Sequence, residues 1–213
     1  MNTGTGSDRP SLVERTKAII LQPSEEWNRI AREETPTRDI MAGYVVPLAL
    51  IGPLSGFIGG QLFGYSPHSL WLAALVAVVT FFFSIFVLLA LVLITDFLSP
   101  KFGGDTSYYQ CLKLVAYSST PAWIAGIFSI VPSLGVFGLL GLYSFYLFYV
   151  GTAPMLNVPR NKATAFTVAV FVCAILLNLV IAFLSTANVQ LLSGMGIISN
   201  SDLAPMHSPS NVE

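Results

Sequence analysis

The chain alternates between five long apolar runs and short polar connections. A helix needs about twenty mostly apolar residues to cross the roughly 30 Å hydrocarbon layer of a bilayer. Five runs reach this length, and they span residues 40–63, 70–97, 112–131, 135–155 and 163–184. The pattern therefore predicts an all-α, polytopic integral membrane protein with five transmembrane helices.

The placement of charge gives these helices a direction. Of the 213 residues, 54% are apolar and 10% are charged, and the mean hydropathy is +0.72. The ten basic residues fall before the first run, at the second connection or in the fourth connection: Arg9, Arg15, Lys17, Arg29, Arg32, Arg38, Lys101, Lys113, Arg160 and Lys162. Because lysine and arginine remain on the cytoplasmic side, we expect a cytoplasmic N-terminus and a C-terminus on the opposite side.

A polar segment, residues 11–39, precedes the first run. Leu12 and Ile19 are separated by charged residues, and a Pro-Ser-Glu-Glu sequence before Trp27 is typical of a helix start. We predict two amphipathic helices here. They lie either in the cytoplasmic membrane interface, with Trp27 at headgroup level, or packed against the ends of the bundle.

The two ends of the chain differ in composition from the part between them. Residues 1–10 and 185–213 are predicted to be mostly disordered, because the tail is rich in Ser, Asn, Gly and Pro. This leaves residues 40–184 as the transmembrane domain. The tail is expected to be extracytoplasmic.

Glycines in the first run indicate close helix packing. Gly52, Gly56 and Gly60 recur every four residues, a spacing that lets another helix approach closely. Pro47 and Pro53 lie in the same run and free backbone carbonyls that neighbours or water must satisfy. We expect a kinked, buried helix with a packing role; a mobile or gating helix is the alternative.

Several polar side chains lie inside the later runs. They are Tyr117, Ser118, Ser119, Thr120, Pro121 beside them, Tyr143, Tyr146 and Asn178. Such residues usually join helices by hydrogen bonds. A polar path through a cavity at the bundle centre is the sharper hypothesis.

One acidic residue, Asp96, lies within a run. It is near the cytoplasmic end and five residues before Lys101. We therefore expect an interfacial ion pair rather than a buried, proton-carrying carboxylate.

No enzymatic constellation emerges. His68 lies in a connection and His207 in the tail, so no intramembrane Ser/His dyad or zinc site can be assembled on this topology. No glycine loop follows a strand in the way that phosphate-binding loops do. We expect no catalytic residue, no metal and no cofactor.

The order of several short motifs resembles a known family. They are QPSEEWNRI at 22–30, FGG at 102–104, AYSSTP at 116–121, YVG at 149–151, and VP and KA at 158–159 and 162–163. Over about residues 11–185 the chain resembles the Yip domain family, the Rab/Ypt-interacting membrane proteins and their bacterial relatives. The resemblance implies five spans and a cytoplasmic N-terminus.

The resemblance also bears on partners and location. Eukaryotic members are associated with Rab GTPases, vesicle traffic and membrane shape. Their Asp-Leu-Tyr-Gly-Pro signature before the first span is absent here, so the resemblance does not extend to a Rab-type GTPase partner. The chain is more similar to bacterial members, which implies the cytoplasmic (inner) membrane.

Two functional hypotheses follow. The first is a non-enzymatic scaffold or bilayer-organising protein, with a trafficking-like role, whose partners are membrane lipids and itself or other membrane proteins, and not nucleic acid. The second is a small transporter or channel subunit, because broken helices beside hydroxyl groups can form a substrate path. The break between Tyr117 and Pro121 would lie on that path.

Overall fold

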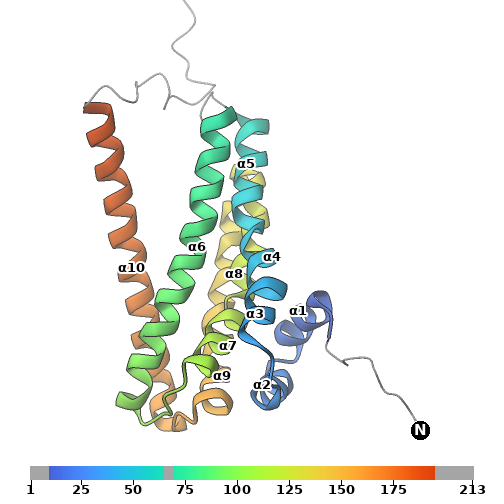
Figure 1. The fold of residues 1–213 in the computed structure, drawn as a ribbon. Coiled ribbons are helices and arrows are strands. Elements are labelled where there is room, and N and C mark those ends of the chain that lie inside the picture. Colours follow the sequence, from blue (N-terminus) through green and yellow to red (C-terminus); the bar gives the residue numbers. More distant parts are fainter. Residues whose placement is uncertain (1–9, 65–69, 195–213) are drawn as a thin grey trace, which may run out of the picture.

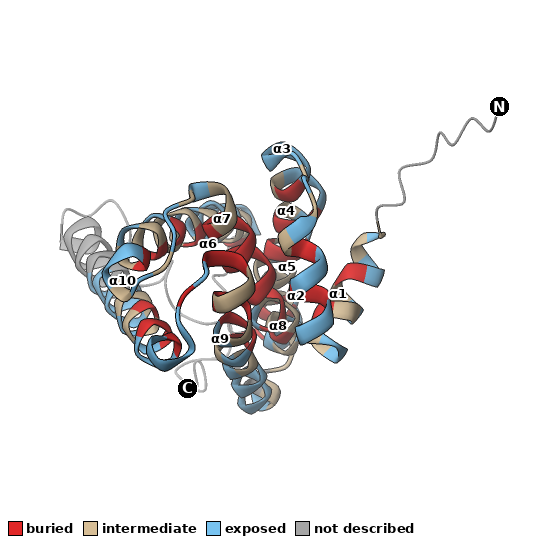
Figure 2. Cartoon of the chain, turned by 90° about the horizontal axis from the view of Figure 1, so that it is seen from below, coloured by how far each residue is buried: buried red, intermediate tan, exposed pale blue. Residues whose placement is uncertain are grey.

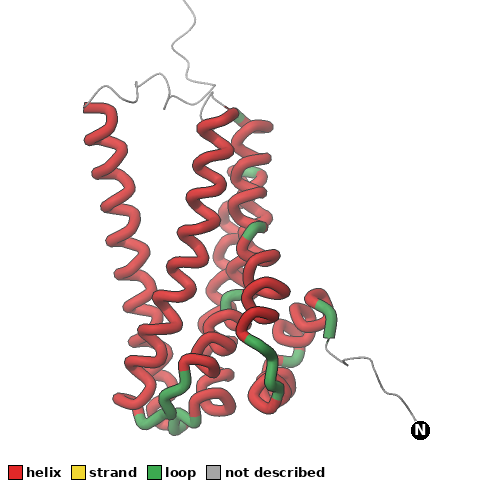
Figure 3. The backbone as a smooth tube through the Cα atoms, viewed as in Figure 1, coloured by secondary structure: helices red, strands yellow, loops and turns green. Residues whose placement is uncertain are grey.

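The computed structural model describes residues 10–64 and 70–194, and within them every regular element is a helix (Figure 3). This confirms the all-α prediction. The predictions for residues 1–9, for the tail from 195 onward and for both histidines lie outside the described residues.

Within residues 10–64 and 70–194, four helices are long and apolar enough to cross a membrane, as judged by length and composition. They are Thr37–Phe63, Leu70–Phe102, Val136–Leu156 and Arg160–Val180. The first contains α3 (Thr37–Ile40), a π-helical turn (Met41–Val45), α4 (Val46–Ala49) and α5 (Ile51–Phe63); the second contains α6 (Leu70–Leu98) and a 3-10 turn (Ser99–Phe102). The third includes α9 (Tyr143–Leu156), and the fourth lies in α10 (Arg160–Gly194).

The predicted third span is broken into short pieces. These are α7 (Tyr108–Ser118), α8 (Thr120–Ala125) and a 3-10 segment (Gly126–Ile130), followed by a further 3-10 segment (Pro132–Leu142). The break follows from Pro121, which has no N–H for the Tyr117 carbonyl; the Thr120 hydroxyl donates to that carbonyl instead, at 2.7 Å. The segment is therefore not among the four long helices, and a count of five spans stays a prediction.

Two other boundaries differ from expectation for local reasons. The first span is interrupted at Leu50, between α4 and α5. Pro53 lies three residues further on, and because it has no N–H, the Ala49 carbonyl lacks its helical donor. At the other end, α10 continues to Gly194 instead of ending at residue 184. Residues 185–193 contain neither Gly nor Pro, so nothing in them stops the helix.

The N-terminal segment forms a hairpin of two helices, α1 (Leu12–Leu21) and α2 (Pro23–Arg32), on one side of the bundle (Figure 1). Pro23 fits the first turn of α2, where its missing N–H would have had no helical partner. We call this pair the N-terminal hairpin. It packs against α9, and α10 stands at the opposite edge of the bundle beside α6.

Buried residues gather where the hairpin meets the bundle. Figure 2 shows them on the inner sides of α2, α7 and α9, and the residues of α10 that are described as buried lie near its start. Among the largest fully buried side chains are Ile19, Trp27, Ile30, Leu114, Leu147 and Phe166. In α6, by contrast, few residues are buried and many of its apolar side chains are exposed, as expected for a helix that faces lipid.

Candidate functional site

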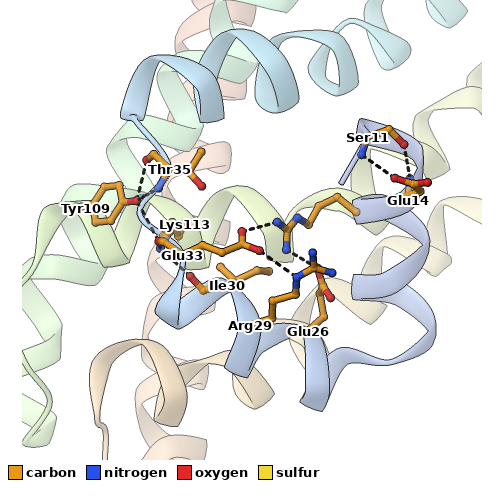
Figure 4. Close-up of polar contacts among 10 residues, drawn as sticks. Ser11, Glu14, Glu26, Arg29, Ile30, Glu33, Thr35, Tyr109 and Lys113 are labelled. Carbon is orange, nitrogen blue, oxygen red and sulfur yellow. Dashed lines mark hydrogen bonds and ion pairs between the residues drawn. The ribbon is translucent and has the colours of Figure 1, made fainter. Parts of the chain in front are cut away.

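A capping box fixes the start of the hairpin. The Ser11 hydroxyl accepts from the backbone N–H of Glu14 at 3.3 Å, and the Ser11 N–H donates to the Glu14 carboxylate at 2.9 Å (Figure 4). These two bonds satisfy donors that the first turn of a helix leaves unpaired. The Ser11 N–H, with a further contribution from its hydroxyl, holds the pKa of Glu14 below its usual value.

A cluster of four charges lies between the two helices of the hairpin. Arg15 on α1 binds Glu26 on α2 and Glu33 just beyond it, and Arg29 Nε lies 3.1 Å from the second oxygen of Glu33 (Figure 4). Arg15 and Glu26 are each only 6% exposed. Buried ions are tolerated only when paired, and here two positive and two negative groups balance.

Lys113 joins this hairpin to the bundle. It belongs to α7, is 1% exposed, and its ammonium group donates to the backbone carbonyls of Ile30 at 2.7 Å and Glu33 at 2.5 Å. These carbonyls lie at the C-terminal end of α2, where backbone acceptors lack helical partners and the helix dipole favours a cation. Lys113 thus caps α2 from a distant part of the chain (Figure 4).

The linker after α2 is held by a second residue of α7. The Tyr109 hydroxyl accepts from the backbone N–H of Thr35 at 2.8 Å and donates to the Thr35 carbonyl at 2.7 Å. The Tyr109 ring also lies 4.6 Å from the Lys113 ammonium, within the range of a cation–π interaction. One phenol therefore satisfies both backbone groups of a linker residue.

We expect Tyr109→Phe to loosen this linker without unfolding the bundle. The change leaves the Thr35 N–H and carbonyl without a partner, which should cost about 1–3 kcal/mol because the groups are half-buried. Hydrogen exchange of the amides at 33–35 should quicken, while α9 amides keep wild-type rates. Tyr108→Phe, at an exposed neighbouring tyrosine, is the matched control; equal exchange in the two variants would contradict the proposed clamp.

Trp27 forms the apolar part of the same junction. Its side chain is fully buried, and its ring makes an edge contact with Tyr117 at 6.4 Å between centroids. A Cβ placed on Gly151 of α9 would lie 2.7 Å from Trp27 Cε2, so only glycine leaves room for the indole. The hairpin is packed against the bundle, the second of the two predicted alternatives, and Trp27 does not face lipid headgroups.

Tyr117 connects this junction to the break between α7 and α8. Its ring lies 4.7 Å from that of Tyr44 and 5.7 Å from the Arg15 guanidinium carbon. The Tyr44 hydroxyl in turn lies 2.7 Å from the Thr120 hydroxyl. A cavity of about 160 Å³ is lined by Arg15, Glu33, Tyr44 and Tyr117 among others. We call the set Arg15, Glu26, Trp27, Glu33, Tyr109, Lys113, Tyr117 and Gly151 the junction.

The predicted polar path is not gathered in one place. Ser118 and Ser119 donate to the Val115 carbonyl of their own helix, at 3.1 and 2.8 Å, and Asn178 donates to Ala174 in the same way. Tyr143 donates to the Ile20 carbonyl of the hairpin at 2.9 Å, and Tyr146 is exposed. Two cavities, of about 190 and 350 Å³, adjoin this region: Ser118, Ser119 and Ser144 line the first, and Ser119 and Asn178 line the second.

The packing glycines lie against the segment after α8. A Cβ on Gly126 would lie 3.0 Å from the Cα of Gly52, so these two backbones approach closely. A Cβ on Gly56 would lie 4.0 Å from Ser129 Oγ, and Gly60 is buried. The 3-10 segment therefore approaches α5 most closely at Gly52.

Asp96 has a different partner from the one predicted. Its carboxylate accepts from the Cys111 thiol, with 3.8 Å between oxygen and sulfur. The Lys101 ammonium instead lies 3.7 Å from the centroid of the Phe97 ring. The predicted Asp96–Lys101 ion pair is therefore wrong, because the 3-10 turn after α6 directs the lysine back over the preceding aromatic ring.

Comparison with known families decides the identity of the domain. A family model described as the Yip1 domain matches residues 17–183, most of the chain. The chain belongs to the Yip1 domain family. It is therefore a Yip1 family membrane protein. No match was found among curated proteins or among solved structures.

In this Yip1 domain the motifs that carried the resemblance meet in space. Trp27 from the first motif contacts Gly151 from the YVG motif. A Cβ on Gly104 of the FGG motif would lie 2.7 Å from Val158, and one on Gly103 would lie 3.6 Å from Pro159. The motifs thus build two contacts: the junction, and the turn after α9.

Proposed function

We propose that this Yip1 family protein is a non-enzymatic scaffold that organises the bilayer and its protein neighbours from the cytoplasmic side. The observation that carries the proposal is the buried junction. Salt bridges join α1 to α2, and Lys113 and Trp27 hold the resulting N-terminal hairpin at one position on the bundle. A rigid presentation of this kind lowers the entropy lost on binding a partner.

The outward face of α1 supports the same proposal. Val13 and Leu21 are 58% and 75% exposed, and Lys17 lies between them at helical spacing. Arg15 and Ile19 on the other face are buried in the protein. An exposed apolar and basic stripe suits either a membrane surface or an adjoining protein.

A small transporter or channel subunit is the second candidate. The cavity of about 190 Å³ favours it, because Ser144 points a buried hydroxyl without a protein partner into an otherwise mostly apolar space. Ser118 and Ser119, however, already donate to the Val115 carbonyl. Uptake of ions or small solutes into proteoliposomes would support this candidate, and no uptake across a broad panel would remove it.

Native mass spectrometry in a mild detergent tests the scaffold proposal. We expect the wild-type protein to retain a second protein chain or bound lipid, and covalent crosslinks to form at Lys17. Val13→Glu with Leu21→Glu should weaken this association at least tenfold, because two exposed apolar side chains lose about 1.5–3 kcal/mol each of burial at an interface.

Glu25→Gln, an exposed change on α2, is the matched control and should behave as wild type. All variants should keep the thermal stability of the wild-type protein, since the changed residues lie on the outer face. A strict monomer that carries neither protein nor lipid would contradict the proposed function.

A further inference from the structure

A polar cavity of about 400 Å³ lies at one end of the bundle, apart from the junction. Ser24 and Asn28 of α2, Tyr149 and Ala153 of α9, and Arg160 of α10 are among the residues that line it. Its volume falls within the range of small-molecule sites, roughly 300–1,000 Å³. The consecutive helices α9 and α10 therefore form one pocket with α2, which is distant in sequence.

The cavity lies at a membrane boundary. The candidate spans Val136–Leu156 and Arg160–Val180 are joined by three residues, so this turn lies where two apolar helices leave the hydrocarbon. Arg160 is the first residue of its span and is exposed. Lipid phosphates occupy the same depth, next to the ends of spanning helices.

The chemistry of the lining favours an anion. Arg160 supplies a guanidinium group, and the described ion pairs, which use Arg15 and Arg29, do not include it. Ser24 and Tyr149 add hydroxyl groups, and the described residues that line the cavity include no carboxylate. Guanidinium binds phosphate oxygens through two parallel hydrogen bonds, whereas lysine acts as a point charge.

We propose that this cavity binds the phosphate of an anionic phospholipid headgroup, with Arg160 as its main ligand. The inference rests on the proposed function and deepens it, since it names the class of lipid that the protein would hold. The hairpin contributes Ser24 and Asn28, so the lipid would be held between the hairpin and two spanning helices. Its acyl chains would remain in the bilayer beside α9 and α10.

The test uses the full-length protein in a neutral detergent, titrated with phosphatidylglycerol or phosphatidylcholine and followed by native mass spectrometry. We expect phosphatidylglycerol to bind at least fivefold more tightly than phosphatidylcholine. Arg160→Gln should lower that affinity about tenfold, because one charge-assisted contact is lost. Arg160→Lys should lower the affinity less, because lysine keeps the positive charge and loses only the pair of parallel hydrogen bonds that guanidinium makes to phosphate.

A variant that keeps every charge separates this site from general attraction to anionic lipid. Ala153→Leu places extra carbon atoms in the cavity, and we expect it also to bind phosphatidylglycerol about tenfold more weakly. Lys101→Gln, whose ammonium lies over Phe97, is the control and should change the affinity less than twofold. Thermal unfolding in the same detergent checks that each variant is folded.

Three results would overturn the inference: wild-type affinity in Ala153→Leu, an equal loss in Lys101→Gln, or competition by soluble glycerol phosphate at the lipid concentration. The last would indicate a site for free phosphate compounds. Val13→Glu with Leu21→Glu leaves this cavity intact. If that variant loses its protein partners but still binds phosphatidylglycerol, the lipid site is intact without the scaffold interface. Failure of one proposal can then be distinguished from failure of the other.

Discussion

Replacing Arg15 by methionine is expected to loosen α1 from α2 and so destabilise the N-terminal hairpin. The change leaves the buried carboxylate of Glu26 without its cation, and breaking a buried pair from one side costs about 3–5 kcal/mol. Glu33 keeps Arg29 and is more exposed, so it adds little to the loss. Hydrogen exchange of the α1 and α2 amides should quicken more than a hundredfold, while α6 should be unchanged.

A second substitution tests the cause of this loss. In Arg15→Met with Glu26→Met, neither charge remains, and apolar replacements of a buried pair are often neutral. We expect this double variant to recover at least half of the lost protection. Arg32→Met, at an exposed residue outside the described ion pairs, is the control. Wild-type exchange in Arg15→Met would contradict the role assigned to the cluster.

Trp27→Ala is expected to destabilise the junction by a similar amount through a different mechanism. Removing a fully buried tryptophan costs about 3–5 kcal/mol, because the transfer free energy is lost and a cavity remains. The thermal unfolding midpoint in detergent should fall, and the hairpin amides should lose protection. Trp71→Ala, at a highly exposed tryptophan of α6, should change neither measurement appreciably.

Gly151 offers a way to show that the contact itself is responsible. Gly151→Ala alone adds a methyl group 2.7 Å from the Trp27 ring and should destabilise by about 1–3 kcal/mol. In the Trp27→Ala background the contacts with the indole are gone and the one with Leu114 Cδ1, at 2.6 Å, remains, so the effect should shrink. Additive losses, within about 0.5 kcal/mol, would show that the two residues do not interact.

The spanning helices could be predicted from the sequence because hydropathy is a local property. The runs at 40–63, 70–97, 135–155 and 163–184 each correspond to a long apolar helix. The run at 112–131 has a comparable length, but Pro121 divides it, and length and overall composition do not record where a helix breaks. The extension of α10 does not follow from hydropathy, because polar residues begin at Ser185 whereas no glycine or proline stops the helix before Gly194.

The junction could not be predicted in the same way, because its partners are far apart in the chain. Two residues gave a signal of burial. Lys113 is a cation one residue inside an apolar run, and Arg15 lies one helical turn before Ile19, which is buried. Neither signal identifies a partner. That Lys113 would bind the carbonyl of Ile30 depends on how α7 is placed against α2, which only the folded structure determines.

The long-range pairing of the junction also orders events during synthesis. The Tyr143 hydroxyl donates to the Ile20 carbonyl, 123 residues earlier in the chain. Gly151, which packs against Trp27, is synthesised later still. At about 5–20 residues per second, the ribosome takes roughly 6–25 s to make that intervening chain. During this time α1 and α2 have left the exit tunnel with their final neighbours not yet made. The hairpin therefore cannot dock until α9 has been made, so its docking is a late step in folding.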